Sequence, residues 1–354
     1  MSKNNQLPVE GIYFNMSFGE YLKCPAISRS FAEAILFDKE EAKYLLENPI
    51  KATPAMDLGT AIHSAILEEE DFKNSYICRP NPKDYTGKIL YTVEDLKPLL
   101  EAFGLKKSGK KGDLIASLKE YINPAEFVIW DDVLETFERE AEISGKKILS
   151  ENDSIILDGL RSKMNNSPEI KQLFDGGYPE ITLIWKDKTT GILCKCRLDY
   201  LRPDAIGELK SFSVKNKKIP LLKTMCREIE NNRYNLQFAI YLNALEQLID
   251  SVNEGKAQIF GKPDPEFLAE LLATNKKRSF IVFVRTAAPF QMRSFEIQRS
   301  ETEGGSMNQY FSVANEKWLD ALYEYRDCLK NGFKNQQEPI ILNDSHLPSI
   351  MYQI

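Results

Sequence analysis

Residues 192–211 read ILCKCRLDYLRPDAIGELKS, and this stretch decides the predicted fold. Two short runs of strand-forming residues flank the sequence Arg-Pro-Asp at positions 202–204, which favours the turn of a hairpin. Alternation along the first run places Cys194 and Cys196 on one face and Asp199 on the other. The stretch therefore predicts an antiparallel hairpin with one apolar and one charged face.

Three charged side chains converge if these two strands pair. Glu208 and Lys210 are two residues apart, so they share a face and can meet Asp199 across the hairpin. The carboxylates offer the hard oxygen ligands that Mg²⁺ prefers, and a lysine can hold a water or offset charge on a phosphate. A solvated surface hairpin carries the same pattern, so both interpretations stay open. The neighbouring Ile206 and Leu209 favour the functional one, because buried charges are seldom kept without a partner or a metal.

The composition is that of an ordinary globular protein. The chain has 354 residues, of which 43% are hydrophobic and 28% charged, and this length predicts about two domains. No apolar run approaches the roughly 20 residues that span a bilayer, and the N-terminus lacks an apolar signal core. We therefore expect a cytoplasmic protein with no membrane partner. The six cysteines form no CxxC pair, which argues against a zinc ribbon.

Positive charge is unevenly distributed along the chain. The formal net charge of -6 does not indicate a nucleic-acid binder, although lysines and arginines gather in three places. Each cluster also fits a solvated face, whereas three of them in an acidic chain favour a polyanion partner. The clusters are Lys106, Lys107, Lys110 and Lys111; Lys215, Lys217, Lys218 and Lys223; and Lys276, Lys277 and Arg278.

Residues 56–70 predict a helix with Asp57 as its N-cap and with His63 on an apolar face. A lone histidine in that setting is usually a hydrogen-bonded core residue, but it becomes a metal ligand if carboxylates approach it. Further helices are expected at 31–47, 131–144, 153–164, 220–246 and 306–331, and further strands at 180–185, 279–285 and 292–297.

Residues 92–122 predict two short helices around a lysine-rich turn, with Thr92 capping the first helix. This unit resembles the SAP domain through Gly-Leu at 104–105, Ser-Gly-Lys-Lys at 108–111 and Leu-Ile at 114–115. Because SAP domains bind DNA, the resemblance implies a DNA-binding insert. A plain helical hairpin with a solvated turn is the alternative.

The assembled motifs resemble the PD-(D/E)XK nuclease superfamily, in its RecB-like branch, and within it the exonuclease VIII (RecE-type) phage recombination enzymes. The motifs that carry this resemblance are Gly-Thr-Ala-Ile-His at 59–63, Asp199, Glu-Leu-Lys at 208–210 and Gln237-x-x-x-Tyr241. The resemblance implies an α/β, restriction-endonuclease-like core with a central mixed sheet flanked by helices. The expected parts are an N-terminal nuclease segment (1–88), the SAP-like insert (89–123) and the main nuclease core (124–354).

Site residues also follow from the resemblance. It implies a Mg²⁺ site, with Mn²⁺ as a substitute and without an iron–sulfur cluster, because only Cys328 lies near the C-terminus. Glu180 matches an acidic position ahead of the catalytic strand, although it also fits a solvated strand end. The expected catalytic residues are Lys210, Glu208, Asp199, Glu180, Gln237 and Tyr241; the metal ligands are His63, Asp199 and Glu208; the nucleic-acid contacts are Lys106, Lys107, Lys110, Lys111, Lys215, Lys217 and Lys218.

The implied activity is a Mg²⁺-dependent DNA exonuclease acting on double-stranded ends in phage-type homologous recombination. An endonuclease or single-strand nuclease of the same fold, and a catalytically inert DNA-binding scaffold, remain alternatives. The implied partners are duplex DNA ends, a single-strand annealing protein and further copies of the chain in a homo-oligomer. The implied setting is a bacterial host cell, with a phage or prophage origin.

Overall fold

A seven-stranded mixed sheet forms the centre of the protein. The computed structural model describes residues 8–48, 52–297 and 306–335. The strand order is β11-β10-β8-β7-β6-β1-β9, with parallel pairing for β8 with β10 and for β1 with β9. The strands are β1 (Gly11–Tyr13), β6 (Tyr178–Lys186), β7 (Leu193–Leu201), β8 (Ala205–Phe212), β9 (Gln258–Phe260), β10 (Arg278–Arg285) and β11 (Met292–Glu296).

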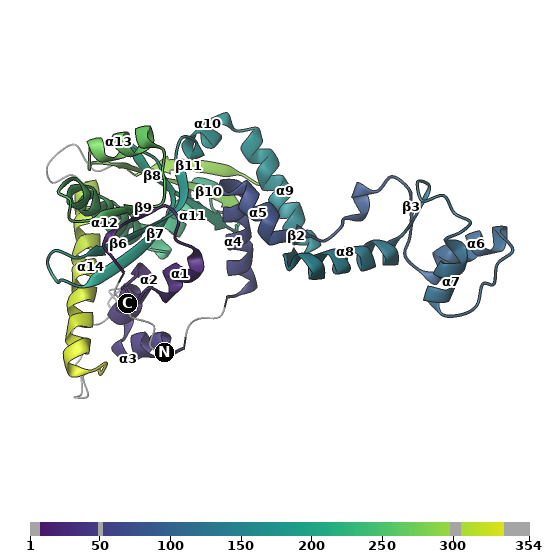
Figure 1. Cartoon of the computed structure of the whole chain (residues 1–354), viewed down its shortest axis with the longest axis horizontal. Helices are drawn as coiled ribbons and strands as arrows, with labels where there is room; N and C mark the ends of the chain where they lie inside the picture. Colours follow the sequence, from purple (N-terminus) through teal and green to yellow (C-terminus); the bar gives the residue numbers. More distant parts are fainter. Residues whose placement is uncertain (1–7, 49–51, 298–305, 336–354) are drawn as a thin grey trace.

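Helices cover both faces of this sheet, which confirms the expected α/β class (Figure 1). Ile281 and Phe283 of β10 belong to the core with α2, α12 and α14, whereas Phe280 and Val282 of the same strand face α4 and α9. No helix among the described residues is long and apolar enough to cross a membrane. The helices of the main body are α1 (Phe18–Lys23), α2 (Arg29–Phe37), α3 (Lys39–Glu47), α4 (Pro54–Leu67), α5 (Glu69–Ser75), α9 (Glu151–Asn165), α10 (Pro168–Lys171), α11 (Leu221–Asn231), α12 (Tyr234–Asn253), α13 (Pro265–Ala273) and α14 (Ser306–Asn331).

The predicted hairpin is present at the middle of the sheet. β7 ends at Leu201 and β8 begins at Ala205, so the turn occupies residues 202–204 as expected. The two strands pair only at Tyr200 with Gly207 and at Leu201 with Ile206, whereas β8 pairs with β10 along its whole length. β8 is therefore held mainly by β10, and its other edge is free to separate from β7.

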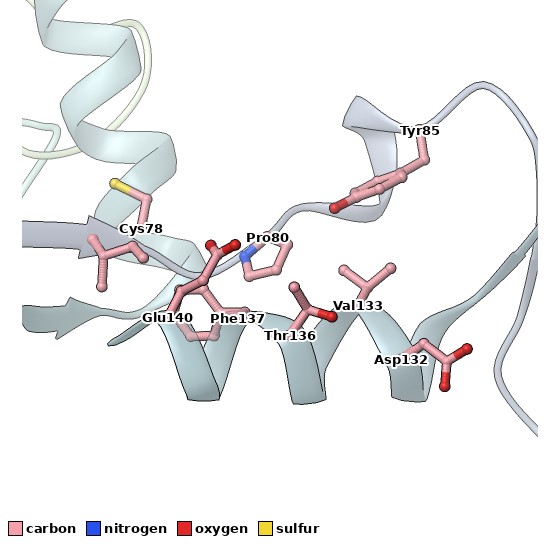
Figure 2. Close-up of a pocket in the computed structure, with 9 residues that line it drawn as sticks. Cys78, Pro80, Tyr85, Asp132, Val133, Thr136, Phe137 and Glu140 are labelled. Carbon is pink, nitrogen blue, oxygen red and sulfur yellow. The ribbon is translucent and has the colours of Figure 1, made fainter. Parts of the chain in front are cut away.

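A helical insert projects from the main body on an arm (Figure 1). The arm consists of α8 (Trp130–Ser144) and the chain that leaves β2 (Tyr76–Cys78), with β5 (Lys147–Leu149) paired to β2 at its base. Figure 2 shows a pocket of about 530 Å³ along the arm, between Pro80 and Tyr85 on one side and α8 on the other. At the far end lie β3 (Lys88–Leu90), α6 (Val93–Ala102), α7 (Lys111–Leu118) and β4 (Phe127–Ile129).

The insert has a hydrophobic core of its own. Leu96 and Leu100 of α6 pack with Leu114 and Leu118 of α7, and all four are buried. Thr92 caps α6 as predicted, since its hydroxyl oxygen accepts from the backbone N–H of Asp95. The two predicted helices of residues 92–122 are confirmed, and the structure adds the paired strands β3 and β4 at their base.

Two predicted helices are each broken in two. The helix expected at 31–47 stops because Asp38 is extended, and the Asp38 carboxylate instead caps α3 by accepting from the amides of Glu40 and Glu41. The helix expected at 220–246 breaks at Arg233, whose φ of 48° lies in the left-handed region.

Two smaller expectations were also wrong. The cap of α4 is Thr53, with Pro54 in the first turn, rather than Asp57. Residues 251–264, for which the sequence pattern predicted a loop or excursion, contain β9, and the pattern did not identify α13.

Because the insert has a separate core, a substitution that creates a cavity in that core should destabilise the insert and leave the central sheet unaffected. Leu100 is fully buried, so Leu100→Ala should destabilise the insert by about 2–5 kcal/mol. Hydrogen exchange followed by mass spectrometry should show faster exchange in α6 and α7 and unchanged protection in β7 and β8. Lys97→Ala, on the exposed side of α6, is the control. Loss of protection in the central sheet would contradict the independence of the two cores.

Candidate active site

Strands β7 and β8 separate at the charged residues. After the two backbone pairs beside the turn, the amide of Leu209 donates to Asp199 Oδ2 at 2.9 Å instead of to a backbone carbonyl. The amide of Asp199 lies 3.5 Å from Glu208 Oε1. Side-chain carboxylates thus take the place of the ladder, which satisfies the backbone donors and leaves both carboxyl groups in the gap.

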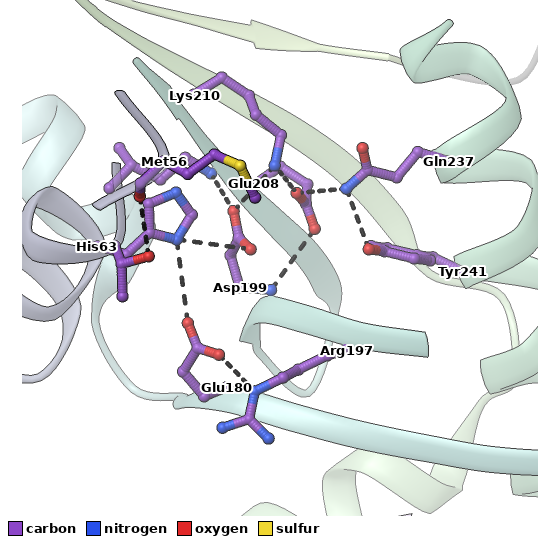
Figure 3. Close-up of polar contacts among 11 residues, drawn as sticks. Met56, His63, Glu180, Arg197, Asp199, Glu208, Lys210, Gln237 and Tyr241 are labelled. Carbon is purple, nitrogen blue, oxygen red and sulfur yellow. Dashed lines mark hydrogen bonds and ion pairs between the residues drawn. The ribbon is translucent and has the colours of Figure 1, made fainter. Parts of the chain in front are cut away.

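The structure brings Glu208 and Lys210 together with α12 (Figure 3). Glu208 has no exposed surface, and its Oε2 accepts from Lys210 Nζ at 2.6 Å and from Gln237 Nε2 at 2.6 Å. Lys210 Nζ also lies 3.4 Å from Asp199 Oδ2, and Gln237 Nε2 donates to the Tyr241 hydroxyl at 3.1 Å. The break at Arg233 therefore does not separate Gln237 and Tyr241 from the predicted site.

A second group lies on the other side of Asp199. His63 of α4 places Nδ1 3.6 Å from Asp199 Oδ1 and 3.9 Å from Glu180 Oε1. One ligand atom from each of these three residues lies within 4.8 Å of the others. Glu208 does not belong to this group, and its oxygens accept from Lys210, Gln237 and the Asp199 amide. Its role as a metal ligand stays a prediction.

Glu180 owes its position to a local distortion of β6. Pro179 pairs with Tyr200 and Ile181 with Leu198, but the pair Glu180 with Asp199 is interrupted without a change of register. Glu180 has a φ of 56°, a left-handed conformation that is unfavourable for a residue with a side chain. The distortion holds the Glu180 carboxylate beside His63.

Two arginines that the sequence reasoning did not assign to the site support it. Arg197 Nε donates to Glu180 Oε2 at 2.5 Å, so it holds that carboxylate in place. Arg29 Nη1 donates to Gln237 Oε1 at 2.7 Å. Because a guanidinium only donates, Gln237 must turn its oxygen to Arg29 and its amino group to Glu208. Arg197 alternates with Asp199 along one strand, which was a usable signal, whereas no local pattern connects Arg29 to Gln237.

The lysines predicted to contact DNA lie in two places. Lys215, Lys217 and Lys218 are exposed in the loop that follows β8. The other four lie in the insert, where Lys107 pairs with Glu101 at 3.0 Å and Lys111 with Asp131 at 2.6 Å. Lys106, Lys107 and Lys110 are all exposed, and of these three Lys106 and Lys110 form no ion pair with the described residues. The insert cluster lies well away from the gap between β7 and β8 (Figure 1).

Burial and neighbouring charges shift the pKa values of the central residues in opposite directions. Burial, with the nearby Asp199 carboxylate, raises the pKa of Glu208 to about 8 despite the opposing charge of Lys210. Burial also acts to raise the pKa of Asp199, but His63 and Lys210 outweigh it and leave that pKa lowered. Burial acts to lower the pKa of Lys210, but the two carboxylates outweigh it and raise that pKa. Asp199 is therefore ionised and Lys210 protonated at neutral pH.

The group of His63, Glu180 and Asp199 fits a divalent cation. It offers two carboxylates and one imidazole, with donor atoms close enough to share one ion. Hard oxygen ligands suit Mg²⁺, and Mn²⁺ also accepts an imidazole nitrogen. Arg197 fixes the Glu180 carboxylate from behind, as a supporting residue does in metal sites.

The sequence of this chain matches the profile of a known protein family. The profile of a "PDDEXK-like domain of unknown function (DUF3799)" matches residues 27–260. A similar solved structure, described as a "Putative exonuclease" from Eubacterium rectale, shares 12% identity with a TM-score of 0.33 and covers 82% of this chain and 97% of its own. That likeness is too weak to bear on activity. No curated protein sequence matches the chain significantly.

The raised pKa of Glu208 predicts a pH-dependent stability of the metal-free protein. Folding raises this pKa from 4.5 to about 8, so the folded state binds the proton more tightly than the unfolded chain does. The contribution of Glu208 to the free energy of unfolding should therefore fall as pH rises from about 4.5 to about 8 and then level off. Urea unfolding at a series of pH values, in the presence of EDTA, measures this slope.

Glu208→Gln should reduce that slope, because the amide does not titrate. Part of the fall should remain, since burial raises the pKa of Glu68 to about 7 with the same sign. Burial acts to lower the pKa of His63, but Asp199 and Glu180 outweigh it and raise that pKa, which adds to the remaining fall. Identical slopes in the two proteins would contradict a raised pKa at Glu208.

Proposed function

Because the chain belongs to the family of PDDEXK-like domains, we propose that it is a metal-dependent deoxyribonuclease that hydrolyses DNA from duplex ends. The observation that supports this most directly is the convergence of Asp199, Glu208 and Lys210 in the gap between β7 and β8. The adjoining group of His63, Glu180 and Asp199 supports a divalent cation as cofactor, with Mg²⁺ the proposed ion and Mn²⁺ a substitute.

Each residue has a distinct task in this proposal. The cation, held by His63, Glu180 and Asp199, would supply Lewis-acid stabilisation of charge on the phosphate. Lys210, kept protonated by its two carboxylates, orients the attacking water or offsets developing charge. Gln237, which also donates to the Tyr241 hydroxyl, holds Glu208, and Glu208 is proposed as a further ligand through an exchange of its present hydrogen bonds.

The finer parts of the proposal concern the substrate and the partners. We propose attack at double-stranded ends, a role in phage-type recombination with an annealing protein, and assembly into a homo-oligomer. We also propose that residues 89–123 form a SAP-like insert that holds duplex DNA through its exposed lysines. An endonuclease, a single-strand nuclease and an inert scaffold are the competing outcomes.

Digestion of linear and covalently closed circular duplex, with Mg²⁺ or with EDTA, tests the activity. We expect loss of linear DNA alone, and only with Mg²⁺. Nicking of the circle would favour the endonuclease, loss of single strands alone the single-strand nuclease, and binding without cleavage the scaffold.

Lys210→Ala should lower the rate of DNA cleavage at least about 100-fold while DNA binding persists. Lys256→Ala, an exposed lysine before β9, is the control. Cleavage by Lys210→Ala at nearly the wild-type rate would contradict its assignment.

The role of the insert makes a separate prediction. Replacing both Lys106 and Lys110 by alanine should weaken DNA binding and reduce the slope of log K against log salt concentration by about 2, because each phosphate contact contributes about 0.9. The rate at saturating DNA should not change, because neither lysine lies near the gap. Lys97→Ala on the same insert is the control. An unchanged slope would leave the insert as a spacer rather than a DNA-binding unit.

A further inference from the structure

The short helix α1 is held in place although none of its residues is fully buried. Its six residues include no buried side chain, and Phe18 and Leu22 are 57% and 61% exposed. A helix of this length is not stable by itself, and only Tyr21 of α1 is partly buried. The centre of its ring lies 4.7 Å from Lys195 Nζ and 6.2 Å from the centre of the Phe18 ring, which stacks beside it. Something other than core formation therefore keeps α1 in position.

Strand β7 supplies the bonds that hold both ends of α1. Lys195 Nζ donates to the carbonyls of Tyr21 at 2.7 Å and Cys24 at 2.8 Å, at the end of the helix. Arg197 Nη1 donates to the carbonyl of Met16 at 2.8 Å, ahead of its start. Lys195 is only 7% exposed, so a buried charge is kept for this purpose. The strand that contains Asp199 thus also anchors α1 through these hydrogen bonds.

One side chain separates the Phe18 ring from the candidate metal group. The guanidinium carbon of Arg197 lies 6.0 Å from the centre of the Phe18 ring, and Arg197 Nε holds Glu180 at 2.5 Å. Leu22 follows Phe18 by four residues, so the two exposed side chains lie on one face of α1. A strand whose phosphate reaches Glu180 therefore comes alongside an exposed aromatic ring.

We propose that Phe18 is a stacking surface for a nucleobase of the DNA strand bound at the site, an inference that rests on the proposed function. A base inside a duplex is stacked on its neighbours and cannot offer its face to a side chain beside the backbone. The strand next to the site is therefore unpaired where it meets α1. Stacking on an aromatic ring tolerates any sequence, as a nuclease without sequence preference requires.

Binding measurements in the Lys210→Ala background test this without cleavage. Fluorescence anisotropy with a single-stranded oligonucleotide and Mg²⁺ should show about 5- to 150-fold weaker binding after Phe18→Ala and little loss after Phe18→Trp. Tyr44→Ala is the matched control, because Tyr44 is 59% exposed on α3. Thermal unfolding midpoints should agree among the variants, since Phe18 is not in the core.

Abasic sites identify the stacked base. An abasic site at one position of the oligonucleotide should weaken binding to the Lys210→Ala protein but cause no further loss once Phe18→Ala is also present. Equal losses in both backgrounds, or unchanged binding after Phe18→Ala, would overturn the inference. If the wild-type chain cleaves DNA and only these results fail, the proposed function stands without the stacking surface. If the Lys210→Ala chain binds no DNA and the wild type cleaves none, the proposed function itself fails.

Discussion

The hydrogen bond from the Leu209 amide to the Asp199 carboxylate determines how the centre of the protein is built. In an ordinary hairpin that amide would pair with a backbone carbonyl of the neighbouring strand. Here the carboxylate replaces the carbonyl, so β7 and β8 separate without leaving an unsatisfied donor. The gap between the strands then receives the side chains of Glu208 and Lys210. Exchanging one backbone acceptor for a side-chain acceptor thus makes room for a cluster of charged side chains within the sheet.

Burial of these charges is costly, and the surrounding contacts serve to offset that cost. A lone carboxylate with no exposed surface would be strongly destabilising, and Lys210 and Gln237 reduce that cost for Glu208. They offset it only in part, because burial and Asp199 still raise the pKa of Glu208 to about 8. Arg29 orients Gln237 in turn, which connects α2 to β8 through a single amide. Such a network adds little net stability, because desolvation consumes most of the attraction. Its main effect is to hold the charged atoms in one arrangement.

The local sequence pattern was sufficient to predict the hairpin of β7 and β8, but it was insufficient to predict the distant residues that support the site. Alternation and turn residues predicted where β7 and β8 lie and which charged residues meet, because both depend on neighbours within about 20 residues. The Arg29 contact spans 208 residues, and no periodicity reports a contact at that distance. The predictions of continuous helices across Asp38 and Arg233 failed for a different reason. Single side chains or backbone angles ended helices whose composition favoured continuation. The catalytic roles of the assembled residues stay predictions.

The arm that connects the insert to the main body also sets the distance between the insert and the candidate active site. Paired strands close it at both ends, β2 with β5 at the body and β3 with β4 at the insert, and α8 runs between them. A tether of this kind differs from a flexible linker, which would let the two parts meet over a wide range of separations. If the insert binds the duplex, an arm that keeps this length raises the effective concentration of DNA at the site for only a narrow set of positions along the duplex. The arm would then act as a ruler, and changing the length of α8 by whole turns would move the preferred distance between grip and cut in steps.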